Sequence, residues 1–464
     1  MERGGGVARG THAATLDSVV KGFGGSPLLC LCFAVAVALG SCDTQGRTRR
    51  TPSKPIPEVE VEPVDPTVEL GKGDTVVVAE PTPEVPDSTV VPDIPASDVA
   101  QVAMLLPFFS DGFSPTTTDL PDNADWAIQY FAGAKLALYD LEAAGERAVV
   151  HVFDSEGDAA TAQRLVQEPD VRRTQAIVAP YLTEAVRAAA TPARAMGMPF
   201  IVPYSAAANL TRGDYPELLQ INPGLPTHLD ALAAYLTSAY APEQITLLGL
   251  PNGQQDKLVA YLMKRHRELD PTQGAWKTWR LHTSEPGMTG LDWTNRFSGS
   301  GPHVFVFPIY NDPLLINGFM SQLQIARGRN EVELVGLPQW TEMSELDPNS
   351  LESLGAAVTV GPRIDYDDPD VIAFTDRYVD AYRVLPELPA LLGYDALAYA
   401  VPLINEHGIE WTEHLPTSFD GLASDYRLQP KYGAGSTEGK PARYENTDVD
   451  VLRFRNFRWG SEER

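Results

Sequence analysis

Short apolar runs and longer segments with helical periodicity alternate along much of the chain, and residues 176–210 show this pattern most clearly. An apolar run at 176–179 ends at a proline, an alanine-rich segment of helical length covers 184–196, and a second apolar run at 200–202 also ends at a proline. Apolar runs too short for helices, joined by a segment of helical length, predict parallel strands that are buried on both faces. The stretch is therefore predicted to form a βαβ unit.

Hydroxyl groups follow both of these predicted strands. Tyr181 and Thr183 come after the first strand, and Tyr204 and Ser205 come after the second. In open α/β sheets a ligand binds beyond the carboxyl ends of the strands, so both loops should face one site. We expect these four side chains to line it.

The same alternation continues on both sides of this unit. Upstream, the pattern predicts strands at 99–106 and 149–153 and helices at 125–144 and 159–167. After a break at 219–223 it predicts strands at 245–250, 303–307, 332–337 and 356–360, with helices at 227–239, 256–267 and 314–327. Two more helices, at 370–383 and 390–405, precede a β-rich tail at 418–427 and 448–459. This order predicts an α/β protein with two doubly wound parallel-sheet lobes around a cleft.

The N-terminal residues have the features of an export signal. An uncharged apolar run at 28–39 suits a signal-peptide core and is too short to span a bilayer comfortably. Residues 39–42, Leu-Gly-Ser-Cys, resemble the bacterial lipobox, in which the cysteine becomes the lipidated first residue. We therefore predict a signal peptide at 1–41 and a lipid anchor on Cys42, which places the protein in the bacterial cell envelope facing the periplasm. Cleavage would remove the other two cysteines and exclude a cysteine nucleophile or a cysteine-ligated zinc.

Residues 42–98 differ sharply in composition from residues 99–464. Proline recurs throughout this segment between glutamates and aspartates, and large aromatic residues are absent. Such a segment cannot bury enough apolar area to offset the entropy of ordering it, and proline and like charges extend it. It is interpreted as a disordered tether, with a role in binding a partner as the alternative.

The chain is strongly acidic, with a formal net charge of −26 and a pI near 4.6. This argues against nucleic acid as a partner, because nucleic-acid binding depends on clustered lysine and arginine. A solvated acidic surface explains the charge, and adaptation to high salt is the alternative.

No catalytic or cofactor motif can be assembled from the sequence. The eight histidines are dispersed without a His-Glu-x-x-His pattern, and there is no Gly-x-Ser-x-Gly elbow. The acidic run at 365–370 could bind calcium, but it lacks the turn glycine and terminal glutamate of an EF-hand and directly precedes a helix, which favours N-capping. We therefore predict no enzymatic activity, no metal and no cofactor.

Several segments, in order, resemble the type I periplasmic binding proteins, both the Leu/Ile/Val-binding group and the related penicillin-binding-protein activator lipoproteins. The matching segments are VAMLLPF at the first strand, residues 130–145, 149–166, 176–186, 199–210, 218–236 and 391–404. The resemblance implies two lobes joined by three crossovers, near 220–223, 360–363 and 414–421. Lobe 1 would then comprise 99–221 with 363–415, and lobe 2 would comprise 222–361 with 416–464.

In that family the ligand lies between the lobes and contacts the loops that follow the strands. By position, the resemblance implies these ligand-binding residues: Phe109, Ser110, Tyr181, Thr183, Tyr204, Ser205, Ala206, Tyr310, Asn311, Gln339 and Trp340.

Two positions depart from the pattern of the amino-acid receptors. Ala206 stands where a threonine is common, and Gln339-Trp340 fills the place of the acidic residue that meets the ligand ammonium. A neutral glutamine cannot supply the charge that a buried ammonium needs. We therefore expect a larger or less charged ligand that stacks on aromatic rings, rather than a free branched-chain amino acid.

Two functions follow from these expectations. The first is a non-catalytic, extracytoplasmic solute-binding lipoprotein that closes its lobes around an amino-acid-like molecule, a peptide or a cell-wall fragment and serves an ABC permease. The second is a protein–protein regulator of cell-wall synthesis, whose tether reaches a cell-wall synthase. A solute receptor predicts a preformed pocket with convergent polar groups, whereas a regulator predicts a filled cleft and an exposed apolar patch elsewhere.

Overall fold

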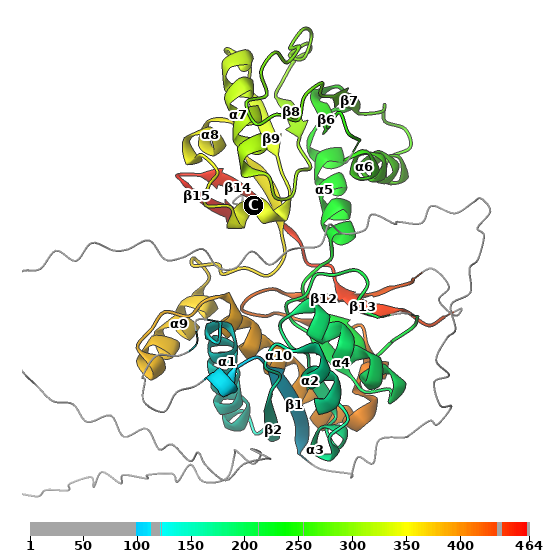
Figure 1. Cartoon of the computed structure of the whole chain (residues 1–464), viewed down its shortest axis with the longest axis vertical. Helices are drawn as coiled ribbons and strands as arrows, with labels where there is room; N and C mark the ends of the chain where they lie inside the picture. The colour runs from blue at the N-terminus through cyan, green and yellow to red at the C-terminus, as the bar shows by residue number, and fades with distance from the viewer. Residues whose placement is uncertain are drawn as a thin grey trace, which may run out of the picture. The chain divides into compact units, whose positions relative to one another are not determined.

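The computed structural model describes residues 99–461 except 113–120, 122, 212, 254 and 434–438. The predicted signal peptide, Cys42 and the tether lie outside the described residues. The described chain folds into two lobes, each built around one mixed β-sheet (Figure 1).

The first lobe contains an eight-stranded sheet. Its strands, in spatial order, are β11 (Ser418–Phe419), β12 (Tyr426–Lys431), β13 (Arg443–Asn446), β5 (Leu218–Gln220), β4 (Phe200–Val202), β3 (Ala176–Val178), β1 (Ala100–Leu106) and β2 (Ala148–Asp154). The strands from β13 to β2 are parallel, whereas β12 pairs antiparallel with both β11 and β13. The parallel part contains the βαβ unit that the apolar runs predict.

Side chains along β1 point alternately to the two faces of the sheet, so the core of this lobe has two layers. Val102 and Met104 point to one face of the sheet, and Ala103 and Leu105 point to the other. The first face is covered by α1 (Asp125–Ala143), α9 (Pro369–Tyr382) and α10 (Leu388–His407), with η4 (Gly408–His414) following α10. The second face is covered by α2 (Ala159–Leu165), α3 (Pro169–Arg172) and α4 (Thr183–Ala195).

Two glycines allow α1 and α10 to pack backbone against backbone. A Cβ atom at Gly133 would lie 1.8 Å from the carbonyl oxygen of Ala390, and one at Gly393 would lie 2.0 Å from that of Tyr130. Among the described residues, one helical stretch, Leu388–His414, is long and apolar enough to cross a membrane, and 61% of its apolar window is buried inside the protein. Packing against α1 accounts for that apolar surface.

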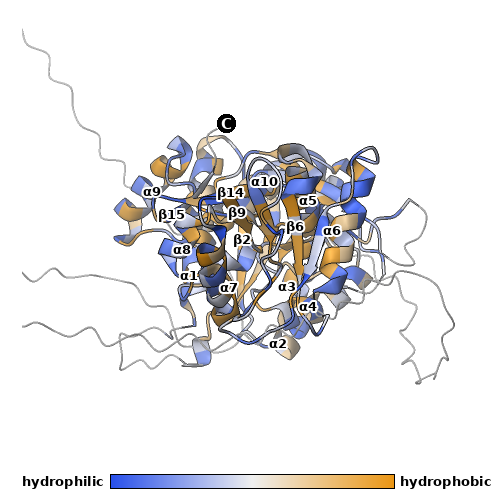
Figure 2. Cartoon of the chain, turned by 90° about the horizontal axis from the view of Figure 1, so that it is seen from above, coloured by the Kyte–Doolittle hydropathy of each residue, from blue (hydrophilic) through white to orange (hydrophobic). Residues whose placement is uncertain are grey.

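The second lobe contains a seven-stranded sheet. In spatial order its strands are β15 (Arg458–Ser461), β14 (Asp450–Arg455), β10 (Ala357–Val360), β9 (Val332–Val335), β8 (His303–Val306), β6 (Ile245–Gly249) and β7 (Lys277–Arg280). One face packs on α5 (Leu225–Ala239) and α6 (Asp256–Leu269), and the other packs on α7 (Pro313–Arg327) and α8 (Pro348–Ser353). Viewed from above, apolar residues concentrate on the strands and polar residues on the helices around them (Figure 2).

The chain passes between the two sheets three times. The first passage joins β5 to α5, the second joins β10 to α9, and the third joins β13 to β14. The sequence expectation placed the third passage at 414–421 and residues 416–464 in the second lobe. The strand pairings correct this, because β11, β12 and β13 belong to the first sheet and only β14 and β15 belong to the second.

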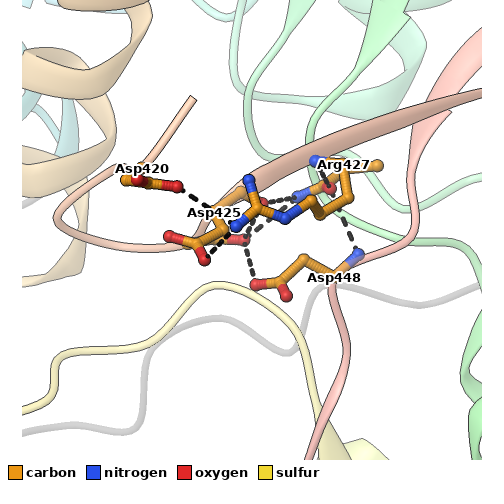
Figure 3. A network of polar contacts seen from close by, with 6 residues as sticks. Asp420, Asp425, Arg427 and Asp448 are labelled. Atoms are coloured by element: carbon orange, nitrogen blue, oxygen red, sulfur yellow. Dashed lines mark hydrogen bonds and ion pairs between the residues drawn. The ribbon is translucent and has the colours of Figure 1, made fainter. Parts of the chain in front are cut away.

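A polar network supports the third passage (Figure 3). The Arg427 guanidinium donates to Asp420 at 3.1 Å and to Asp425 at 2.8 Å. The Ser424 hydroxyl donates to the Asp448 carboxylate at 3.2 Å, and the side-chain amide of Asn446 donates to Ser424 Oγ at 3.0 Å. These contacts tie the last residues of β13 to the loop before β12.

Candidate ligand site

The loops after β1 and β2 are held together by one carboxylate. Asp154, at the end of β2, accepts hydrogen bonds from the backbone N–H groups of Phe108 at 2.9 Å, Ser110 at 2.7 Å and Glu156 at 2.8 Å. These bonds give the two loops one arrangement beyond the carboxyl ends of their strands. Ser110 remains exposed, and its hydroxyl lies 3.3 Å from the Glu156 carboxylate.

Phe109 is held in an uncommon backbone conformation, with a φ of 53°. Its ring lies over Gly157, where an added Cβ would come within 2.9 Å of two ring carbons. The side chain is half-buried, and it packs on its own lobe in the loop after β2.

The loops after β3 and β4 meet the start of α1 in a group of three half-buried aromatic rings. The ring centroids of Tyr181 and Tyr204 are 4.5 Å apart, and Trp126 lies 4.6 Å from Tyr181 and 6.0 Å from Tyr204. We refer to Trp126, Tyr181 and Tyr204 as the aromatic wall. Trp126 is absent from the predicted site residues because only positions that follow strands were considered. Its place in the first turn of the predicted helix at 125–144, directly after a long loop, is the sequence signal that could have identified it.

The aromatic wall carries an unused donor and is anchored to the first passage. The indole nitrogen of Trp126 is buried without a hydrogen-bond partner among the described residues. The side-chain amide of Asn222 donates to the carbonyl oxygen of Tyr204 at 2.7 Å. Burial, followed by the neighbouring Tyr181 and then by Glu342, raises the pKa of the Tyr204 hydroxyl above its ordinary value.

The two predicted hydroxyls on these loops bond to each other. Thr183 Oγ1 and Ser205 Oγ are 2.9 Å apart, and Ser205 is buried. The structure therefore brings together the loops that the sequence placed in one site. Ala206, the next residue, is exposed and offers no polar side-chain group.

In the second lobe the loop after β8 carries Tyr310 and Asn311. Tyr310 is half-buried, and its hydroxyl has no hydrogen-bond partner among the described residues. Burial raises the pKa of this hydroxyl above its ordinary value. Asn311 is exposed, and the adjacent Asp312 accepts from the backbone N–H of Leu315 at 2.9 Å to cap α7.

Trp340 does not lie where the sequence expectation put it. It belongs to η3 (Pro338–Glu342), is 1% exposed and packs in the core of the second lobe. Its ring fills the space above Gly336, where an added Cβ would lie 2.2 Å from a ring carbon, and its indole N–H donates to the Ile309 carbonyl at 3.0 Å. Trp340 thus supports the loops after β8 and β9 and presents no free stacking face.

Glu342, at the end of the same 3-10 turn, was missed by the sequence reasoning. It is exposed, and its carboxylate has no ion-pair or hydrogen-bond partner among the described residues. Desolvation by the surrounding protein raises the pKa of this carboxyl above its ordinary value. Its negative charge contributes to the raised pKa of Tyr204, so it acts on the aromatic wall from the second lobe. It comes three residues after Gln339, which is half-buried with an unpartnered amide oxygen.

The loops that carry these side chains are acidic. Residues 107–112, 154–158, 180–183, 203–206, 308–312 and 337–342 contain no lysine, arginine or histidine. They contain Asp111, Glu156 and Glu342, and the pKa of Glu156 is raised by desolvation and by the nearby Asp154 and Asp111. These loops can therefore bind a ligand by contact with aromatic rings and by attraction to carboxylates.

The acidic side chains of the described residues do not assemble into a metal site. Across the described part of the chain, no group of three or more potential metal-ligating side chains is present. Asp368, from the acidic run before α9, instead accepts from the backbone N–H groups of Asp370 at 2.7 Å and Val371 at 3.4 Å, as the N-cap prediction required. Two surface cavities of about 180 and 260 Å³, one beside Arg443 and one beside Trp279, are lined by none of the predicted ligand-binding residues.

The sequence and the structure were each compared with known proteins. No protein-family model matches the sequence, and no curated protein matches it. Among solved structures, a branched-chain amino acid ABC transporter protein from Rhodospirillum rubrum is similar at a TM-score of 0.56 and 15% identity, over 78% of this chain and 100% of that one. A branched-chain amino acid ABC transporter periplasmic ligand-binding protein from Burkholderia xenovorans gives a TM-score of 0.53 and 13% identity, over 78% and 94% of the two chains.

An ABC transporter substrate-binding protein from Desulfitobacterium hafniense, solved in complex with Leu, gives a TM-score of 0.51 and 14% identity, over 78% of this chain and 99% of that one. Identities this low establish a shared architecture and leave the ligand open. The two lobes, their mixed sheets and the three passages between them are those of the type I periplasmic binding protein fold.

Proposed function

We propose that this chain is a non-catalytic solute-binding protein that holds a small ligand between the strand-end loops of its two lobes. One observation carries the proposal: three aromatic rings gather at the strand-end loops of the first lobe, and Glu342 of the second lobe lies near enough to contribute to the raised pKa of Tyr204. Strand-end loops that face one another in this fold are where ligands bind. The similar solved structures support this function, since all three are named as ABC transporter proteins, one as a substrate-binding protein and one as a periplasmic ligand-binding protein.

In this proposal ligand binding is linked to lobe closure. The three passages act as the hinge, and the ligand gains affinity as both lobes exclude water from its surface. Rings that are half-buried without ligand would become fully buried, which contributes about 25 cal/mol for each Å² of apolar surface removed from water. The closed form would be the one that a membrane partner recognises.

We propose further that the protein works at the membrane surface. A lipid on Cys42 would anchor it, the segment 42–98 would act as a tether, and an ABC permease would receive the ligand. This arrangement is inferred from the sequence features at 28–42 and from the named functions of the similar structures.

Thermal unfolding of the purified full chain in the presence of amino acids, short peptides and cell-wall fragments tests the proposed function. A ligand present at ~100 times its dissociation constant should stabilise the protein by roughly 2.7 kcal/mol. Tyr204→Ala should reduce that shift, whereas Tyr139→Ala, an exposed tyrosine on α1, should leave it unchanged. If no compound in a broad panel of small solutes stabilises the protein, the receptor function is wrong.

A second candidate function, regulation of a cell-wall synthase, is favoured by a surface observation. Four apolar side chains at and beside α9 are exposed: Tyr366 at 68%, Ile372 at 48%, Val384 at 53% and Leu385 at 71%. Binding of the purified chain to a purified synthase, compared with the Ile372→Asp and Leu385→Asp variants, tests this candidate. A regulator should lose synthase binding in both variants, and a solute receptor should keep its ligand-induced stabilisation in both.

A further inference from the structure

We propose that the ligand of this site is an organic cation without a carboxylate group, such as a quaternary ammonium or a protonated amine. This inference rests on the proposed function, since it names the chemical class of the solute that the same site would bind. Three properties of the site carry it: its aromatic rings, its negative charge, and the absence of lysine, arginine and histidine from the six loops described above.

The aromatic wall provides the faces that attract a cation. Trp126, Tyr181 and Tyr204 lie within 6.0 Å of one another and are each half-buried, so part of each ring remains accessible. A cation within about 6 Å of an aromatic ring centroid is attracted by the negative potential of the ring face, and more strongly when water is excluded. The three rings pack on one another, and Trp126 also stacks on Tyr130 with ring centroids 5.0 Å apart, so a cation would contact the ring surface that these neighbours leave uncovered.

The negative charge of the site has no counter-charge within the described part of the protein. The Glu342 carboxylate has no ion-pair partner among the described residues, and Glu156 contacts only the Ser110 hydroxyl and carboxylates. The pKa values of both carboxyls are raised, as expected of charges that are desolvated without a cation beside them. An incoming cation would supply the missing positive charge from the ligand side.

A ligand carboxylate finds little to bind it here. Residues 107–112, 154–158, 180–183, 203–206, 308–312 and 337–342 contain no lysine, arginine or histidine that could pair with it. The donors that these loops and the aromatic wall offer, such as the Trp126 indole N–H and the Tyr310 hydroxyl, are uncharged. Ala206 adds no donor. An anionic group placed near these loops would instead meet Asp111, Glu156 and Glu342, whose like charges oppose it.

Three probes of nearly equal size separate charge from shape. Choline carries a quaternary ammonium, 3,3-dimethylbutan-1-ol replaces its nitrogen by carbon and is neutral, and glycine betaine keeps the ammonium but adds a carboxylate. Isothermal titration of the full chain at constant ionic strength should give at least tenfold tighter binding of choline than of either other compound. Equal affinities for choline and the neutral alcohol would overturn the proposal, as would tighter binding of betaine.

Single substitutions test whether Glu342 and Tyr204 are responsible for choline binding. Glu342→Gln should weaken choline binding about tenfold and leave the neutral alcohol unchanged, whereas Glu345→Gln, an exposed glutamate nearby, should change neither. Tyr204→Phe keeps the ring face and should retain binding, and Tyr204→Ala should lose it. Unchanged choline binding in Glu342→Gln would contradict the assigned role.

The proposed function and this inference can fail separately. If a neutral or zwitterionic solute from the wider panel stabilises the protein and choline, tetramethylammonium and simple primary amines do not, the inference is wrong and the receptor function stands. If no solute of any class binds, both are wrong.

Discussion

The carboxylate of Glu445 on β13 joins the sheet of the first lobe to the first turn of α5 through a hydrogen bond from the hydroxyl of Thr227 at 2.5 Å. The same oxygen accepts from the backbone N–H of Gly224 at 3.0 Å, and the other oxygen pairs with Arg443. Glu445 is 1% exposed. A single buried side chain therefore connects two of the passages between the lobes, the one after β5 and the one after β13.

Replacing Glu445 should destabilise the protein strongly. Glu445→Gln leaves the half-buried Arg443 without its counter-ion, and breaking a fully buried pair by removing one partner costs about 3–5 kcal/mol, so a loss toward the lower end of that range is expected. Thr227→Val removes only one hydrogen bond and should cost about 1 kcal/mol. Urea unfolding of the two variants should give these different losses, and equal losses would contradict the central role of the carboxylate.

Glu445 should also contribute to acid sensitivity. Burial acts to raise the pKa of this carboxyl, but Arg443 and the bond from Thr227 outweigh it and hold the pKa below the ordinary value. A group whose folded-state pKa is lowered stabilises the protein at neutral pH, and that stability is lost as the pH falls through the folded-state pKa. The difference in unfolding free energy between the parent and Glu445→Gln should therefore shrink when measured at decreasing pH, below about 4.

Asp395 should have the opposite pH dependence. It is fully buried in α10 and accepts from the backbone N–H groups of Leu422 and Ala423, each at 2.8 Å. Burial is the largest influence and raises the pKa of Asp395 from 3.8 to about 7. Stability contributed by a group with a raised folded-state pKa is complete below the unfolded-state pKa and is lost as the pH rises through the folded-state value.

Asp395→Asn tests this dependence. Between about pH 4 and pH 7 the parent should lose stability, on the order of a few kcal/mol, that the neutral asparagine variant does not lose. The measurement is the unfolding free energy of both proteins across this range, read as their difference so that other titrating groups cancel. A constant difference would show that the carboxyl titrates normally.

Trp340→Ala should act on stability rather than on ligand binding directly. The ring is fully packed above Gly336, so its removal leaves a cavity and should cost about 3–5 kcal/mol, whereas Trp340→Phe should cost less because most of the volume remains. Thermal unfolding without ligand measures both losses. Wild-type stability in Trp340→Ala would instead agree with the original expectation of an exposed, ligand-facing ring.

Asp368→Ala distinguishes helix capping from cation binding before α9. Loss of the two backbone hydrogen bonds to Asp368 should lower stability by about 1 kcal/mol. Addition of calcium or of a chelator should leave the melting temperature of the parent unchanged. A calcium-dependent increase in melting temperature that disappears in Asp368→Ala would contradict the capping role.

Much of the fold could be predicted from the sequence because each parallel strand is buried on both faces. Such a strand consists of a continuous run of apolar residues. The runs at 176–179 and 200–202 became β3 and β4, and the segment between them became α4. The hydroxyl-bearing loops followed from the same pattern, since the carboxyl ends of parallel strands share one edge of a sheet.

The sheet to which the C-terminal strands belong could not be predicted from the sequence. The residues of β12 alternate between polar and apolar, and β13, Arg-Tyr-Glu-Asn, is mostly polar, so neither has the continuous apolar run of a buried parallel strand. The pattern therefore does not show which sheet edge each strand pairs with. The structure resolves it through the pairing of β13 with β5 and the buried bond from Thr227 to Glu445. The third passage between the lobes consequently lies after β13.

The residues of the candidate site were likewise predicted only in part from the sequence. The sequence by itself determined which loops lie at the strand ends, and so it identified Tyr181 and Tyr204. Only the tertiary structure decided that Trp126 packs beside them, that Trp340 is buried in the core of the second lobe and that Glu342 contributes to the raised pKa of Tyr204. The reason is that periodicity reports which face of an element is buried, whereas the direction of a loop side chain depends on packing between segments that are far apart in the chain.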